Sequence, residues 1–161
     1  MNVVFADLAR CPCGLEQNYQ DCCKPLHDFV ISAPEAQALM RSRFCAFCLK
    51  NVDYIVQTTV PSQQAQLDKQ ALQAWADNTD WTQLHIISHN KVGKHHAQVR
   101  FRAYFQDGAG KQCHDELSTF VNIAKKWCFL DPTVPCVLTN KQPCLCGSGN
   151  KFKQCCGKFL R

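Results

Sequence analysis

Residues 143–157 read PCLCGSGNKFKQCCG, in which a C-x-C pair is followed after eight residues by a C-C pair. A matching order stands near the other end of the chain, where residues 10–23 read RCPCGLEQNYQDCC. The two stretches share C-x-C-G, an aromatic residue at Phe152 or Tyr19, and a closing C-C at the same spacing. Equal spacing and equal residue types indicate two copies of one small motif, with the rest of the chain between them.

Four closely spaced cysteines are typical of a metal site, because Zn²⁺ prefers four thiolate or imidazole ligands in a tetrahedron. Gly14 and Gly147 suit the tight bend that a C-x-C pair needs around an ion, since glycine tolerates positive φ. We expect two Zn²⁺ ions, one at each end of the chain. The expected ligands are Cys11, Cys13, Cys22 and Cys23 in the first motif and Cys144, Cys146, Cys155 and Cys156 in the second. A site closed by four protein ligands is structural rather than catalytic.

Other uses of these cysteines stay open. Iron–sulfur clusters are also held by four cysteines, and each motif has enough thiols for two disulfides. We prefer zinc to disulfides because vicinal cysteines such as Cys22 and Cys23 rarely bridge without strain. His27, which follows four residues after Cys23, is an alternative fourth ligand in the first motif.

Length and cysteine content narrow the class of protein. The 161 residues suffice for one ordinary domain and two small appendages. Thirteen cysteines would fit a secreted disulfide scaffold, but residues 1–9 lack the basic start and apolar core of a signal peptide. No stretch reaches the length of a membrane span. We therefore expect a cytoplasmic protein without a membrane segment, where clustered cysteines bind metal.

The charge distribution is more informative than the net charge of +5. Eight thiolates and two divalent ions would together bring four negative charges and leave about +1, which is weak support for nucleic-acid binding. The second motif nevertheless carries Lys151, Lys153 and Lys158 and no acidic residue. We expect these three lysines to contact an acidic partner.

The middle of the chain changes from a helical period to a strand period. Apolar residues spaced for one face predict three helices over residues 36–48, 52–59 and 67–76. Alternation then predicts four strands over residues 81–88, 97–106, 112–123 and 127–130. The turn over residues 107–110 joins the second and third strands as a hairpin. Three helices and an antiparallel four-strand sheet make an α+β fold, in which the curved sheet forms a cone with a pocket.

Both ends and the middle resemble known proteins. The C-terminal stretch is similar to the SEC-C motif, a zinc-binding tail of the preprotein translocase ATPase and of many bacterial proteins. The N-terminal copy has Leu15 and Glu16 where that motif has Ser and Gly. The stretch MRSRFCAF at residues 40–47, with Trp81, Leu84 and Trp127 further on, resembles the YchJ family of bacterial SEC-C proteins. The resemblance implies a nuclear-transport-factor-like, cystatin-type cone domain between two zinc motifs, and a family activity that is not established.

These patterns predict that the chain is divided into three segments. We expect an N-terminal zinc knuckle over residues 1–27, the α+β cone domain over residues 32–133, and a C-terminal zinc knuckle over residues 141–161. A C-x-x-C stands at Cys45 and Cys48, inside the first predicted helix and away from the helix start that activates redox thiols. We expect these two thiols to pack in the core, and His95 and His96 to form a surface pair beside a turn.

The cone domain offers candidate pocket residues, namely Arg41, Arg43, His114 and Glu116. The alternative for the two arginines is a solvated helix face with salt bridges to Asp53 or Glu116, which we prefer. His114 and Glu116 could share a pocket with Arg100 and Arg102, or all four could form cross-strand ion pairs on an outer face. Alternation alone does not say which face is inside, although the face with Phe101 is the more apolar and should pack on the helices.

Three functions remain open at this point. The leading hypothesis is a zinc-binding, non-enzymatic interaction protein that contacts a protein partner through the lysines of the second motif. The second is nucleic-acid binding through the same lysines with Phe152 and Phe159. The third is a cone pocket that binds a small ligand or carries acid–base chemistry at His114 or Glu116. We prefer the first because no convincing catalytic set is visible, and we also expect that a homodimer can form through the open sheet.

Overall fold

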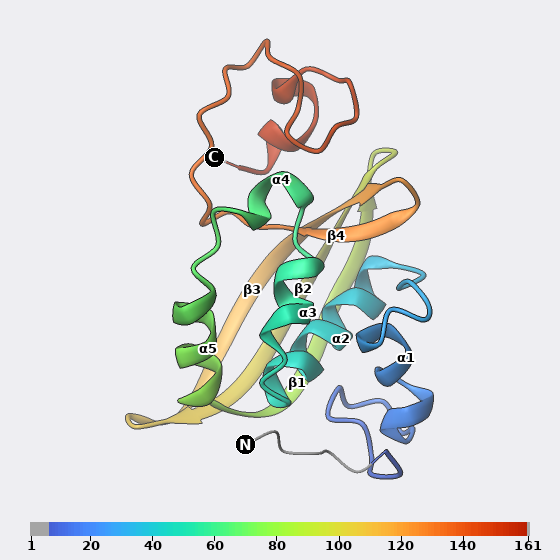
Figure 1. The fold of residues 1–161 in the computed structure, drawn as a ribbon, viewed down its shortest axis with the longest axis vertical. Helices are drawn as coiled ribbons and strands as arrows, with labels where there is room; N and C mark the ends of the chain where they lie inside the picture. Colours follow the sequence, from blue (N-terminus) through green and yellow to red (C-terminus); the bar gives the residue numbers. More distant parts are fainter. Residues whose placement is uncertain (1–6, 161) are drawn as a thin grey trace.

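The computed structural model describes residues 7–160, which form a curved sheet, helices on its concave side, and a cysteine motif at each end (Figure 1). The strands are β1 (Asp80–Val92), β2 (His96–Asp107), β3 (Gly110–Ile123) and β4 (Lys126–Leu130). Neighbouring strands pair antiparallel in the order β1-β2-β3-β4. The predicted α+β class and the four-strand meander are therefore confirmed.

The helices are more numerous than the sequence predicted. The described residues form α1 (Lys24–His27), α2 (Ala36–Cys48), α3 (Val52–Gln57), α4 (Pro61–Gln64) and α5 (Lys69–Asp77). The expectation of three helices was wrong, because α1 and α4 are additional single turns. Both begin with a proline in the first two positions, where the missing N–H has no helical partner to lose. Pro61 is the first residue of α4.

Side-chain caps fix the start of two helices. The carboxamide oxygen of Asn51 accepts a hydrogen bond from the Tyr54 N–H at 3.2 Å, at the start of α3. A carboxylate oxygen of Asp68 accepts one from the Ala71 N–H at 3.0 Å, at the start of α5. Each cap satisfies an N–H that has no partner within its helix. Because Asp68 is the cap, α5 begins at Lys69 and not at residue 67 as predicted.

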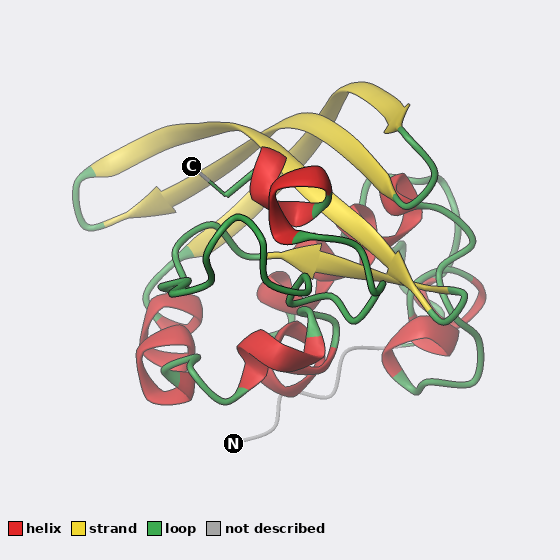
Figure 2. Ribbon diagram, turned by 90° about the horizontal axis from the view of Figure 1, so that it is seen from above, coloured by secondary structure: helices red, strands yellow, loops and turns green. Residues whose placement is uncertain are grey.

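The strand register decides which face of the sheet lies inside. Phe101 lies opposite Glu116, and Ala103 lies opposite His114. Directly opposite residues point to the same face, and Phe101 and Ala103 belong to the buried core. His114 and Glu116 therefore face the helices, which lie under the sheet in Figure 2.

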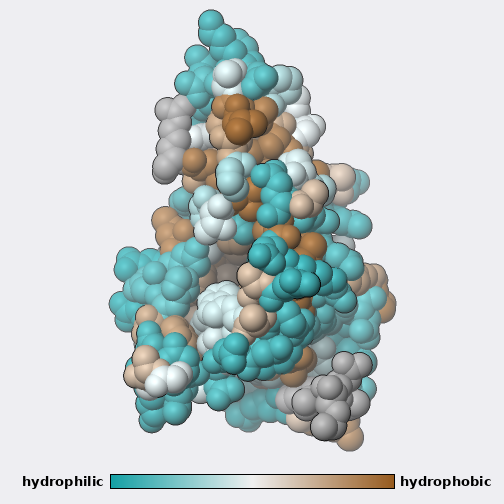
Figure 3. All heavy atoms as spheres, turned by 60° about the vertical axis from the view of Figure 1, so that its left-hand side comes forward, coloured by the Kyte–Doolittle hydropathy of each residue, from teal (hydrophilic) through white to brown (hydrophobic). Residues whose placement is uncertain are grey.

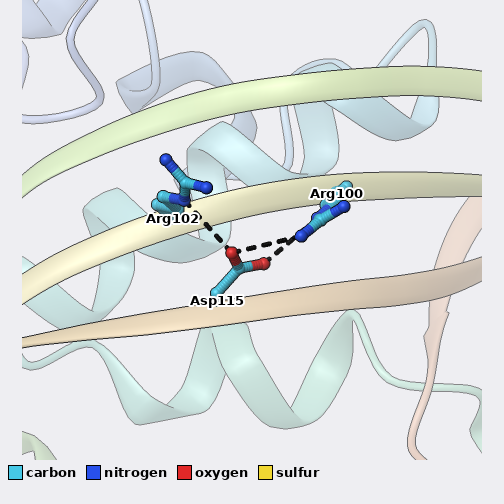
Figure 4. Close-up of polar contacts among 3 residues, drawn as sticks. All are labelled: Arg100, Arg102 and Asp115. Atoms are coloured by element: carbon cyan, nitrogen blue, oxygen red, sulfur yellow. Dashed lines mark hydrogen bonds and ion pairs between the residues drawn. The ribbon is translucent and has the colours of Figure 1, made fainter.

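The other face of the sheet carries an exposed ion-pair cluster, drawn in Figure 4. Nε of Arg100 lies 3.2 Å and Nε of Arg102 lies 3.1 Å from the carboxylate of Asp115. These arginines belong to cross-strand ion pairs on the outside, as one of the two sequence interpretations had it. The interpretation that placed them in one pocket with His114 and Glu116 is wrong.

The main core lies between α2 and the concave face. Leu39, Met40 and Phe44 of α2 pack there against residues of β2 and β3, including Phe101 and Phe120. Burying a side chain of this size contributes about 1.5–3 kcal/mol, so these contacts fasten α2 to the concave face of the sheet. Within residues 7–160, no helix has both the length and the apolar character to cross a bilayer.

Candidate metal centres and a cavity

The C-terminal cysteine motif is a tight loop closed by a short 3₁₀ turn. The Cys144 N–H donates to the Asn150 carbonyl at 2.8 Å and closes the loop. The 3₁₀ turn Phe152–Gln154 then brings the C-C pair back toward the C-x-C pair. As a result, Sγ of Cys146 lies 3.5 Å from Sγ of Cys155.

The N-terminal motif has the same backbone geometry. The Cys11 N–H donates to the Gln17 carbonyl at 2.8 Å, and the 3₁₀ turn Tyr19–Asp21 follows at the corresponding place. Gly14 has φ +92° and Gly147 has φ +80°, a left-handed conformation that glycine adopts at little cost. The repeat that the spacing predicts is therefore present in three dimensions, and Leu15 and Glu16 do not abolish the bend.

Each motif gathers four thiols at a distance that fits one metal ion. The Sγ atoms in each cluster all lie within 4.8 Å of one another. A Zn–S bond of about 2.3 Å in a tetrahedron separates the sulfurs by about 3.8 Å, so a small contraction would complete the site. The clusters are Cys11, Cys13, Cys22 and Cys23 in the first motif and Cys144, Cys146, Cys155 and Cys156 in the second. Both clusters can hold a metal ion, and all their cysteines are free thiols.

The thiols within a cluster perturb one another. A hydrogen bond from the Cys156 thiol lowers the pKa of Cys146 to about 4, and the same contact raises the pKa of Cys156. In the first cluster a hydrogen bond from Cys13 lowers the pKa of Cys11. Since a metal binds thiolates, ion binding must release the protons of the remaining thiols.

A histidine of the sheet attaches the second cluster to the central domain. Nε2 of His96 lies 3.3 Å from Sγ of Cys156, and its ring packs on Phe159 at 4.8 Å between centroids. His96 is only 7% exposed, so the expectation of a surface pair with His95 was wrong. If Cys156 binds a metal as a thiolate, an N–H at Nε2 of His96 would donate to its sulfur and fix its orientation.

Helix α2 attaches the first cluster. Nη1 of Arg41 donates to the Cys13 carbonyl at 2.9 Å. His27 bridges the motif to the helix, because its Nδ1 lies 2.6 Å from the Tyr19 hydroxyl and its Nε2 lies 2.8 Å from the Ser42 carbonyl. Both ring nitrogens of His27 are thus occupied, and His27 is not among the residues whose ligand atoms gather at the first cluster.

A fifth thiol lies beside the first cluster. Cys45 is fully buried, and its Sγ is 3.8 Å from Sγ of Cys11. Cys48, its partner in the C-x-x-C, lies elsewhere on α2, and burial raises its pKa to about 12. The expected packing role of both thiols agrees with their burial, but the contact between Cys45 and the cluster escaped sequence analysis.

The three lysines of the second motif are exposed. Within residues 7–160, no ion pair forms at Lys151, Lys153 or Lys158. In the first motif, by contrast, Nζ of Lys24 lies 3.6 Å from carboxylates of Asp7 and Asp28. Figure 3 shows hydrophilic side chains over the upper tip, where Figure 1 places the C-terminal segment.

The four candidate pocket residues lie at two separate sites in the structure. Arg43, His114 and Glu116 line one cavity of about 310 Å³ between the helices and the sheet, whereas Arg41 lies at the first cluster. The preferred interpretation of Arg43 as solvated was wrong, because its side chain is only 6% exposed. Asp53, the suggested ion-pair partner, pairs with Lys69 instead.

The fold and the clusters together define the class, an α+β cone domain that carries a SEC-C type cysteine motif. The sequence model of the SEC-C motif matches residues 141–158, and the one described as "YchJ, middle NTF2-like domain" matches residues 35–132. The chain belongs to the YchJ family, whose members also carry the name UPF0225.

Close relatives share nearly the whole chain. A UPF0225 protein of Actinobacillus succinogenes is 53% identical over 94% of this chain and 99% of its own. One from Haemophilus influenzae is 50% identical over 95% of this chain and 94% of its own. A crystal structure of a SEC-C motif containing protein from Psychrobacter arcticus has a TM-score of 0.89 at 47% identity, covering 95% of this chain and 98% of the other. The solution structure of one from Rhodopseudomonas palustris has a TM-score of 0.71 at 36% identity, covering 76% and 96%.

Proposed function

We propose that each cluster holds one structural Zn²⁺ and that the protein is a non-catalytic interaction protein. In this proposal the exposed lysines of the second motif contact an acidic protein partner. The observation that carries it is the pair of four-thiol clusters with matching backbones, each fastened to the central domain. Bound zinc would supply the cross-link that such a short, loop-rich segment needs to stay folded.

The chemistry of the clusters supports zinc. Four thiolates in a tetrahedral arrangement suit Zn²⁺, and the vicinal pair in each motif disfavours disulfides. All four protein ligands come from the motif itself, so no coordination position is left for substrate. A closed site of this kind supports a structural role and not hydrolytic chemistry.

The charge contrast between the motifs supports a docking surface at the second one. Lys24 in the first motif is neutralised by nearby carboxylates, while Lys151, Lys153 and Lys158 are exposed without such neighbours among the described residues. Exposed like charges without counter-ions favour encounter with a surface of opposite sign. The partner proposed here is a protein with an acidic patch.

Nucleic-acid binding is the less favoured alternative. It would need aromatic side chains free to stack on bases. Phe152 is only 5% exposed, and Phe159 packs on His96. The two aromatic residues named for this role are therefore engaged in the fold.

A charge-reversal comparison tests the docking surface. The variant with Lys151, Lys153 and Lys158 changed to Glu should lose cross-linked protein partners in cell extract, while its zinc content and melting temperature stay unchanged. The matched control reverses three exposed lysines of the sheet hairpins, Lys91, Lys94 and Lys111, and should keep the partners. The proposal would be contradicted if both variants lost the partners equally. It would also be contradicted if the wild-type protein lost its partners after nuclease treatment. The second of these results would point to nucleic acid.

A further inference from the structure

The cavity between the helices and the sheet has an aromatic wall and a charged end. Its volume is about 310 Å³, at the lower end of the range for small-molecule sites. Figure 3 brings the α5 side forward and shows a recess at mid-height. The apolar wall includes six aromatic residues, namely Phe44, Phe47, Trp75, Trp81, Phe101 and Phe129.

Arg43 places a buried positive charge in this wall. Its Nη1 donates to the Ile55 carbonyl at 2.9 Å and to Oγ1 of Thr58 at 2.6 Å, and the Phe129 ring lies 4.5 Å from its Cζ. Burial lowers the pKa of Arg43 to about 10, so the guanidinium stays charged at neutral pH. Nε and Nη2 make no hydrogen bond to the described residues, and no carboxylate among them lies within ion-pair distance of Arg43.

The carboxylates of the cavity, unlike Arg43, have partners of their own. Oε2 of Glu116 lies 3.0 Å from Nε2 of His114. Oδ1 of Asp131 accepts hydrogen bonds from the Thr133 N–H at 2.8 Å and from its hydroxyl at 2.6 Å. The charges of Asp131 and Glu116 act on Arg43 and raise its pKa against the effect of burial, but neither carboxylate hydrogen-bonds to it. Nε and Nη2 of Arg43 are therefore N–H donors that a ligand in the cavity could use. A buried charge is costly unless it is paired, and an anionic acceptor would complete it.

We propose that the cavity binds a small aromatic carboxylate. Its carboxylate would accept hydrogen bonds from Nε and Nη2 of Arg43, in the side-on pairing that a guanidinium offers. Its ring would lie against Phe47, Trp75 and Trp81, whose rings already meet edge-on at centroid distances of 5.2 and 5.4 Å. Aromatic contacts of this kind contribute beyond the apolar area that they bury.

The ring end offers one more polar group. The indole Nε1 of Trp81 is buried and has no hydrogen-bond partner among the described residues. A donor left in this state costs about as much as a lost hydrogen bond. Because this N–H exposes almost no surface, a ring oxygen could accept from it only after the indole turns toward the cavity.

A matched set of probes tests the charge preference. We would titrate the zinc-loaded full chain with 3-phenylpropionate, 3-phenylpropanamide and 3-phenylpropylamine and follow heat and tryptophan fluorescence. The acid should bind saturably at one site and roughly ten- to hundredfold more tightly than the amine. The amide should lie between them, because it keeps an acceptor oxygen but carries no charge.

Four variants assign the site. Arg43→Gln keeps donors for Ile55 and Thr58 but removes the charge, and should weaken the acid roughly tenfold or more. Glu116→Gln removes a nearby negative charge and should tighten it. Ala103→Leu, in the cavity wall, should abolish binding without changing any charge. Arg100→Gln on the outer face is the matched control and should have no effect.

The binding results of the probes and variants either support or overturn the proposed carboxylate site. Binding of the acid that is lost in Ala103→Leu and tightened in Glu116→Gln supports the proposal even if Arg43→Gln does not fold. Absence of saturable binding by all three probes, tighter binding of the amine, or binding unchanged in Ala103→Leu would overturn it. None of these results depends on the partner of the lysine surface.

Discussion

Gly157 directly follows the second C-C pair, and its substitution should weaken the C-terminal metal site without touching a ligand. A Cβ atom at this position would lie 2.5 Å from the Phe152 carbonyl oxygen and 2.9 Å from the carbonyl carbon. Cβ contacts shorter than 3.0 Å do not occur in relaxed structures, and both atoms belong to the backbone. Gly157→Ala must therefore push the 3₁₀ turn Phe152–Gln154 away from the C-C pair.

The size of the effect follows from this overlap. Overpacking of one methyl group in a tight site costs about 1–3 kcal/mol. If the strain falls on the metal-bound geometry, zinc affinity at this site should fall about five- to hundredfold. The N-terminal site should keep its affinity, because its contacts run through α2 and not through residue 157.

A chelator competition measures this directly. Zinc-loaded protein is titrated with a metallochromic chelator, and the released zinc is read by absorbance. Gly157→Ala should release one of two zinc equivalents at a lower chelator concentration than the wild type. The control is Gly108→Ala, where nothing lies within 4 Å of the added Cβ and φ is not positive, and its release curve should match the wild type. If Gly157→Ala and the wild type release both equivalents together, the packing account of this motif is refuted.

Three further changes test the first motif. His27→Gln should keep both zinc equivalents. It should lower the free energy of unfolding by about 1–3 kcal/mol, because it removes two buried hydrogen bonds. Loss of one zinc equivalent would show that His27 is a ligand. Burial lowers the pKa of His27, so its folded pKa lies below the unfolded value of about 6.5. Its contribution to stability is then present above that pH and is lost as the pH falls below it. Urea unfolding at several pH values should show this decline in the wild type and less of it in His27→Gln, and parallel curves would contradict it. Cys45→Ala should keep both zinc equivalents and lose only about 1 kcal/mol of stability, and release of zinc would show that the fifth thiol is a ligand.

The repeated cysteine motif and the meander could be predicted because both depend on local spacing. The number of residues between the C-x-C pair and the C-C pair is the same in both motifs, and both motifs fold into the same turn. Strand alternation is equally local. Single-turn helices are harder, since α1 and α4 have too few residues for a periodic pattern, and proline marks the start of a helix as well as its end.

The inside of the sheet follows from the hairpin turn and the apolar face taken together. The hairpin turn at Gly108 fixes the register of β2 and β3, so Phe101 must lie opposite Glu116. Because the Phe101 face is the apolar one, Glu116 and His114 had to face the helices. Arg43 carried a similar signal, since it stands four residues after Leu39 and three after Met40, on the same side of α2. An arginine on a helix face is more often solvated, and at this position the spacing is the stronger signal.

Contacts between distant parts of the chain had no such signal. His96 meets Cys156 across sixty residues, and Cys45 meets Cys11 across 34. Neither contact follows from periodicity or from a turn. Both arise because the two motifs fold back onto the central domain, which depends on the whole packing of the sheet and α2.

Elemental analysis of the purified protein, prepared without added metal or chelator, tests the central claim most directly. The two four-thiol clusters predict about two zinc atoms per chain in the wild type and about one in each of Cys11→Ser and Cys144→Ser. One zinc or none in the wild type, iron in place of zinc, or a variant that loses both ions at once would contradict two independent zinc sites.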